Sequence, residues 1–178
     1  MVDPRSARRL GHYAIFAAIA ALTTFLRLLP VNPAPGGIPG PDLMVAFTFV
    51  WLMRRPDYVP ALLIVAVFLF EDLIYWRPVG LWTLAMLGGT EFLRARVRPG
   101  RHMPLPVEIA LVGAVTLTML LGNRLILGLV MIEQPGLGPE MLRWLMTLVA
   151  YPFVVALSEL AFGLRRPAPG ESAVRHGA

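Results

Sequence analysis

The chain has 178 residues, of which 57% are hydrophobic and only 15% are charged. A soluble domain of this length has no interior large enough for so much apolar surface, so the composition excludes a soluble globular protein and indicates one that faces lipid. The formal net charge is +5, and all of the basic residues are arginines, since the chain has no lysine. The chain also has no cysteine, which excludes disulfides and thiolate metal sites.

Apolar runs bounded by charge, proline or glycine predict six membrane-spanning helices in one polytopic domain, residues 1–166. The predicted spans are residues 10–29, 42–53, 58–76, 79–93, 106–131 and 139–164. The second span is short, because its residues rise only about 18 Å against a hydrocarbon core of about 30 Å. The tail that follows this domain, residues 167–178, is predicted to be disordered and cytoplasmic.

Arginine predicts the orientation of these spans. If all six cross the membrane, 12 of the 16 arginines fall on one side, before the first span or after the second, fourth and sixth. By the positive-inside rule this side is the cytoplasm, so both termini are expected inside. A re-entrant second segment would move Arg54 and Arg55 outside, which the same rule disfavours. No nucleic-acid motif is present, and the basic charge therefore indicates topology instead of nucleic-acid binding.

The groups that enzymes need are missing from the predicted spans. Ser158 is the one serine in a span, without a buried base beside it, and we expect its hydroxyl to bond to its own helix or a neighbour. Glycine-rich phosphate loops and HExxH motifs are absent. The three histidines fall near span ends, in a loop and in the tail: His12, His102 and His176. We therefore predict a protein that is not an enzyme and that has no metal site and no cofactor.

Ionisable residues gather in the outer third of the predicted bundle, judged from a rise of about 1.5 Å per residue. Charges at this depth need a partner or polar surroundings. One interpretation is that they reach lipid headgroups or pair inside the bundle, and the other is a polar cavity or a partner-docking surface. The sequence leaves both open. The set consists of Arg27, Asp42, Glu71, Asp72, Arg124 and Arg143.

A tight, charged turn is predicted on the cytoplasmic side, formed by Arg54, Arg55, Pro56 and Asp57. Its arginines serve as a topogenic signal, and Asp57 is expected to cap the helix of the third span. We also predict that this RRPD turn contacts a cytoplasmic partner or anionic lipid.

Two consecutive stretches resemble the rod shape-determining protein family MreD. They are PDLMVAFTFVWLMRRPDYVPALLI, Pro41–Ile64, and FLFEDLIYWRPVGLWTLAMLGGTEFLR, Phe68–Arg94. The likeness rests on PDL before a short apolar span, the R-R-P-D turn, an acidic residue closing the next helix, and a Pro-Gly turn into the fourth. It covers about a third of the chain.

This resemblance implies an integral inner-membrane component of the bacterial elongation machinery, which directs lateral peptidoglycan synthesis and maintains rod shape. The implied partners are a bitopic MreC-like protein, a RodA-like glycosyltransferase, a class B penicillin-binding protein, an MreB-type actin filament and membrane lipid.

The MreD family is also similar in fold to the six-helix substrate-binding subunits of energy-coupling-factor transporters. That similarity implies an alternative function, a subunit that binds a vitamin-type small molecule. Two Ala-xxx-Ala pairs on the first span, Ala14 with Ala18 and Ala17 with Ala21, would suit docking to a transporter partner.

Overall fold

The protein is described here by a computed structural model that covers residues 4–29, 39–96 and 103–163. Within these ranges the chain is all-helical, as the apolar runs predict. The predicted tail, residues 167–178, lies outside the described residues. The helices, with the short 3-10 helix η1, are α1 Pro4–Leu28, α2 Leu43–Arg54, η1 Pro56–Tyr58, α3 Ala61–Ile74, α4 Leu81–Arg94, α5 Leu105–Leu129 and α6 Leu137–Phe162.

Each predicted span corresponds to one α-helix, but α1 begins six residues earlier than predicted and the third and fourth helices begin later. Helix α3 begins at Ala61 because residues 56–58 form η1 and Pro60 takes the N-cap position with an extended backbone. The prediction that Asp57 caps this helix is therefore wrong. Helix α4 begins at Leu81 because Gly80 before it has a φ of +88°, a left-handed conformation that glycine adopts without strain.

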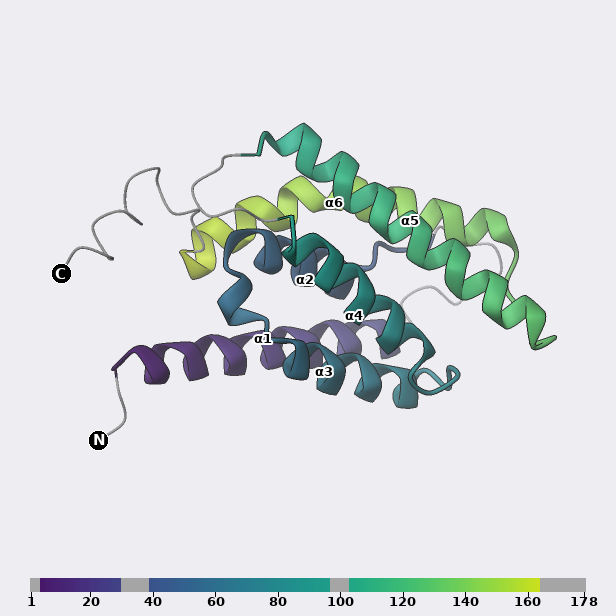
Figure 1. Ribbon diagram of the computed structural model, residues 1–178, viewed down its shortest axis with the longest axis horizontal. Helices are drawn as coiled ribbons and strands as arrows, with labels where there is room; N and C mark the ends of the chain where they lie inside the picture. The colour runs from purple at the N-terminus through teal and green to yellow at the C-terminus, as the bar shows by residue number, and fades with distance from the viewer. Residues whose placement is uncertain (1–3, 30–38, 97–102, 164–178) are drawn as a thin grey trace.

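Successive helices run in opposite directions along the long axis of the molecule, so that α1 begins and α6 ends at the same end (Figure 1). Helix α2 also ends there, with Arg54, and we call this the Arg54 end. The other end, where α2 begins after Asp42, is the Asp42 end.

Helix α2 forms the core of the bundle. Its sequence, LMVAFTFVWLMR, is apolar around the whole circumference, and a helix without a polar face is stable when other elements enclose it. All of its residues from Met44 to Arg54 are buried, and α1, α4 and α6 pack around it (Figure 1). The Thr48 hydroxyl donates to the Met44 carbonyl at 2.8 Å, so this polar group is satisfied inside its own helix.

Three of the described helices are long and apolar enough to cross a membrane: residues 9–28 of α1, and the whole of α5 and α6. Only 22–33% of their most apolar windows is buried inside the protein, so most of this apolar surface faces outward. The other helices, α2, α3 and α4, have 12, 14 and 14 residues and rise about 18–21 Å. Helices α5 and α6 therefore project beyond α3 and α4 at the Asp42 end (Figure 1).

Glycines allow α5 to pack closely against both of its neighbours. A Cβ atom on Gly89 of α4 would lie 2.5 Å from the Met119 sulfur of α5. A Cβ atom on Gly113 of α5 would lie 3.1 Å from the Leu148 side chain of α6. Small residues at such positions let helix backbones approach one another.

Candidate functional site

At the Asp42 end, the first two predicted site residues form an ion pair. Asp42 is the N-cap of α2, where its Oδ1 accepts the Val45 backbone N–H at 3.3 Å. Its Oδ2 accepts from Arg27 Nη2 of α1 at 2.9 Å, and its own N–H donates to Thr147 Oγ1 of α6 at 2.8 Å. One aspartate therefore joins three helices at the start of α2.

The neighbouring acids Glu71 and Asp72 are both buried, but they serve different helices. Glu71 accepts the Thr24 hydroxyl of α1 at 3.2 Å. The Oδ2 atom of Asp72 accepts from the Gly80 N–H, the Thr83 N–H and the Thr83 hydroxyl at 3.1, 3.2 and 2.8 Å. Because these donors lie at the start of α4, Asp72 caps that helix from across the turn.

The two remaining residues of the predicted outer set lie on α5 and α6. The Nη1 atom of Arg124 pairs with Glu140 Oε2 and also donates to the Pro135 carbonyl, both at 2.8 Å. Arg143 is exposed and interacts electrostatically with Glu140 and with both members of the Arg27–Asp42 pair. The structure thus brings all six predicted residues to one end, where they divide into separate contacts.

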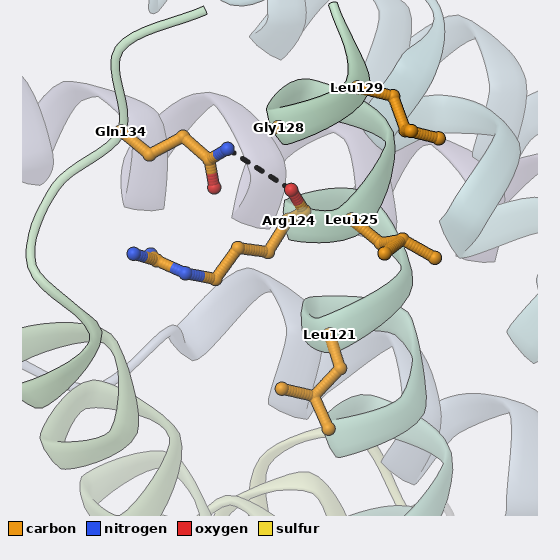
Figure 2. Close-up of a pocket in the computed structure, with 6 residues that line it drawn as sticks. All are labelled: Leu121, Arg124, Leu125, Gly128, Leu129 and Gln134. Carbon is orange, nitrogen blue, oxygen red and sulfur yellow. Dashed lines mark hydrogen bonds between the residues drawn. The ribbon is translucent and has the colours of Figure 1, made fainter. Parts of the chain in front are cut away.

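An open hollow of about 480 Å³ lies on the projecting part of α5, close to Arg124. In Figure 2 the leucine side chains point away from the arginine, and the Gln134 Nε2 atom donates to the Arg124 carbonyl at 3.0 Å. The hollow is mostly apolar, which suits a lipid chain better than a polar ligand. Its lining consists of Leu121, Arg124, Leu125, Gly128, Leu129 and Gln134.

At the Arg54 end, the first arginine of the RRPD turn points into the bundle. The Arg54 side chain is only 3% exposed, and its Nη1 pairs with Glu108 Oε1 of α5 at 2.9 Å. Its Nε contacts Glu159 Oε1 of α6 at 3.3 Å, and the Tyr151 hydroxyl donates to the same Glu108 oxygen at 2.7 Å. This buried cluster ties the end of α2 to α5 and α6.

The rest of the RRPD turn is held from α4 and α1. Arg94 of α4 donates to the carbonyls of Pro56 and Val59 at 2.9 and 2.7 Å. From α1, the Tyr13 hydroxyl donates to the Asp57 carbonyl at 3.2 Å. Among the predicted turn residues, Arg55 is half-buried and Asp57 is exposed, so a binding partner can reach both of them.

Sequence reasoning missed the residues that hold the turn. Glu108 and Glu159 were not among the predicted site residues, although each lies in a predicted span at about the depth of Arg54. Ser158 is fully buried, and its hydroxyl has no hydrogen-bond partner among the described residues, contrary to our expectation. In the described part of the chain, no group of three or more His, Asp or Glu residues is placed to hold a metal ion.

No protein-family model, curated protein or solved structure matches this chain. The resemblance to MreD therefore stays a prediction that depends on the stretches Pro41–Ile64 and Phe68–Arg94. The expected likeness in fold to energy-coupling-factor subunits also stays a prediction. What the structure adds is the arrangement of these stretches, which form the central helix α2, the RRPD turn and the α3–α4 hairpin.

Proposed function

We propose that this protein is a non-enzymatic, multi-pass component of the bacterial inner membrane that acts as an MreD-type scaffold in the elongation machinery. The observation that carries the proposal is the RRPD turn, which lies in the MreD-like stretch and is held firmly in place. Arg54 is anchored inside the bundle, while Arg94 holds the carbonyls on either side of Tyr58. Such a turn presents Arg55 and Asp57 in a defined geometry, as a docking element requires.

The proposal includes six membrane crossings with both termini in the cytoplasm. Support comes from the alternating direction of the helices (Figure 1) and from the arginines, which follow α2 and α4 at the Arg54 end. The shorter helices would require a locally thin bilayer or polar surroundings at the Asp42 end.

The proposed partners are an MreC-like bitopic protein, a RodA-like glycosyltransferase with its class B penicillin-binding protein, and an MreB-type filament on the cytoplasmic side. Helix α1 offers a surface for a membrane helix, because its small residues Ala14, Ala17, Ala18 and Ala21 are all exposed. Small residues permit close approach of a second helix within a membrane.

Co-purification from native membranes tests this proposal. The full chain should capture an MreC-like partner, and Arg55→Ala should weaken capture about tenfold, the effect of losing one charge-assisted contact. Arg96→Ala is the matched control, since Arg96 is exposed at the same end but lies outside the MreD-like stretch. If the Arg55→Ala and Arg96→Ala variants capture the MreC-like partner equally well, the RRPD turn is not part of the interface.

The alternative function is a vitamin-type binding subunit of a transporter, whose membrane partner could use the same exposed alanines on α1. The two functions give different results in cells and after purification. Depletion of a shape scaffold rounds up rod-shaped cells, whereas depletion of a vitamin-binding subunit yields rods that need the vitamin. A tightly bound vitamin in a preparation without any MreC-like partner would overturn the scaffold proposal.

A further inference from the structure

Two arginines at the Asp42 end lie over one aromatic ring, and a third interacts with them electrostatically. The guanidinium carbons of Arg27 and Arg77 lie 5.5 and 5.1 Å from the centre of the Tyr75 ring. Arg77 also lies 5.8 Å from the Trp82 ring, and Arg143 interacts electrostatically with both other arginines. Because like charges repel one another, a cluster of arginines is stabilised by an anion beside it.

At least one oxygen of each nearby carboxylate is engaged in holding the helices, whereas the second Asp72 oxygen, Oδ1, is buried without a hydrogen-bond partner among the described residues. Asp42 caps α2 and accepts from one of the three arginines, Glu71 accepts a threonine hydroxyl, and Asp72 caps α4. Among the described residues, neither Arg77 nor Arg143 has a carboxylate oxygen within 4.0 Å. Two of the three guanidinium groups therefore have no carboxylate in direct contact among the described residues, although Arg77 interacts electrostatically with Glu71, and Arg143 with Asp42 and Glu140.

Hydrogen-bond donors without partners lie in the same place. The Arg27 Nη1 atom, the Tyr75 hydroxyl and the Trp82 Nε1 atom are all buried, and none of them has a hydrogen-bond partner among the described residues. Buried polar atoms in proteins are nearly always paired, so each exception needs an explanation. Two of these groups, the arginine and the indole, can only donate, and the matching ligand is one rich in acceptor oxygens.

We propose that this arginine cluster, made of Arg27, Arg77, Arg143, Tyr75 and Trp82, binds a phosphate group. Guanidinium groups match the oxygens of phosphate in geometry as well as charge. The donors come from α1, α4, α6 and the α3–α4 turn, and a phosphate group has enough acceptor oxygens to bind donors from several elements.

A lipid headgroup is the source of phosphate that the surroundings favour. The α3–α4 turn beside the cluster exposes Trp76 and Val79, which are 95% and 62% accessible, and Phe25 on the neighbouring α1 is 58% accessible. Exposed aromatic and aliphatic side chains next to arginines are typical of the membrane interface. This inference does not depend on the scaffold proposal, because any membrane function is compatible with a bound lipid phosphate.

Thermal unfolding of the full chain in a phosphate-free maltoside detergent tests the site. Three probes are titrated separately: phosphatidylglycerol, inorganic phosphate, and diacylglycerol with the same acyl chains but no phosphate. A ligand that binds only the folded state raises the melting temperature in a saturable way. We expect phosphatidylglycerol to do so and diacylglycerol to have no matching effect.

The double variant Arg77→Gln with Arg143→Gln should bind phosphatidylglycerol at least about tenfold more weakly, since each arginine supplies a charge-assisted contact. The control Arg9→Gln with Arg96→Gln removes the same charge from exposed positions toward the other end and should bind normally. If the double variant does not fold, Arg143→Gln alone serves, because that side chain is exposed.

The outcomes separate the sources of phosphate. A response to phosphatidylglycerol that the arginine variant loses supports a lipid site, and a response to inorganic phosphate alone, lost in the same variant, supports a soluble phosphate ligand. The proposal is overturned if diacylglycerol acts as strongly as phosphatidylglycerol, if no probe has an effect, or if both double variants lose the response equally.

Discussion

Replacing Glu108 by glutamine should destabilise the protein strongly, because it removes the charge that compensates a buried arginine. The pair joins Arg54 and Glu108, whose side chains are 3% and 0% exposed. The substitution keeps the size of the side chain and its ability to accept a hydrogen bond, so the change acts on charge and not on packing.

The magnitude follows from how much compensation remains. Breaking a buried ion pair by removing one partner costs about 3–5 kcal/mol. Glu159 stays within 3.3 Å of Arg54 and is itself 43% exposed, so it offsets part of the loss. We therefore expect Glu108→Gln to lower the free energy of unfolding by about 3 kcal/mol, the lower end of that range.

Equilibrium unfolding in mixed micelles of maltoside and dodecyl sulfate measures this loss, with tryptophan fluorescence as the signal. Glu91→Gln is the matched control, because it breaks a pair on the surface, in which the side chains of Arg94 and Glu91 are 27% and 48% exposed. It should lower the free energy of unfolding by less than about 1 kcal/mol. The double variant Arg54→Met with Glu108→Met should recover most of the stability, since no charge is left buried. Equal losses in Glu108→Gln and Glu91→Gln would refute the reasoning.

Two further substitutions test the contacts at α4 and α2. Gly89→Ala places a methyl group against Met119 and should lower the free energy of unfolding by about 1–3 kcal/mol. The control Gly88→Ala has open space at its Cβ position and should leave the free energy of unfolding unchanged. Equal effects of the two variants in thermal unfolding would contradict the α4–α5 packing. Asp42→Ala removes both the cap of α2 and the partner of Arg27 and should cost about 1–2 kcal/mol, while Asp42→Asn keeps the cap and should cost less. A larger loss in the asparagine variant would count against the capping role.

Hydropathy was sufficient to predict the helices, because each apolar run is long enough to define one element. The position of α2 also follows from its sequence, since an apolar helix without a polar face belongs in the interior. The start of α3 was less predictable: the pattern alone did not show that Pro56 opens a 3-10 turn or that Pro60 delays the α-helix.

Pairing between charges was beyond prediction for a different reason. Arg54 lies 54 and 105 residues from its partners Glu108 and Glu159, and only the fold brings them together. Glu71 and Asp72 are neighbours in sequence, yet successive positions on a helix point in different directions, so one contacts α1 and the other α4. A useful signal was available: an acid in each of α5 and α6 at the depth of Arg54 predicts internal pairing.

The enclosure of α2 has a consequence for biosynthesis. Helix α6 covers α2 and carries Glu159, but the ribosome makes this residue 105 positions after Arg54. At elongation rates of about 5–20 residues per second, Arg54 waits roughly 3–11 s for Glu108, and one side of α2 waits roughly 5–20 s for α6 and Glu159. During this interval the nascent chain holds an incomplete bundle in the membrane. The enclosure of α2 is therefore completed by α6, and a chain interrupted before α6 would expose its own core to lipid or to quality-control proteases.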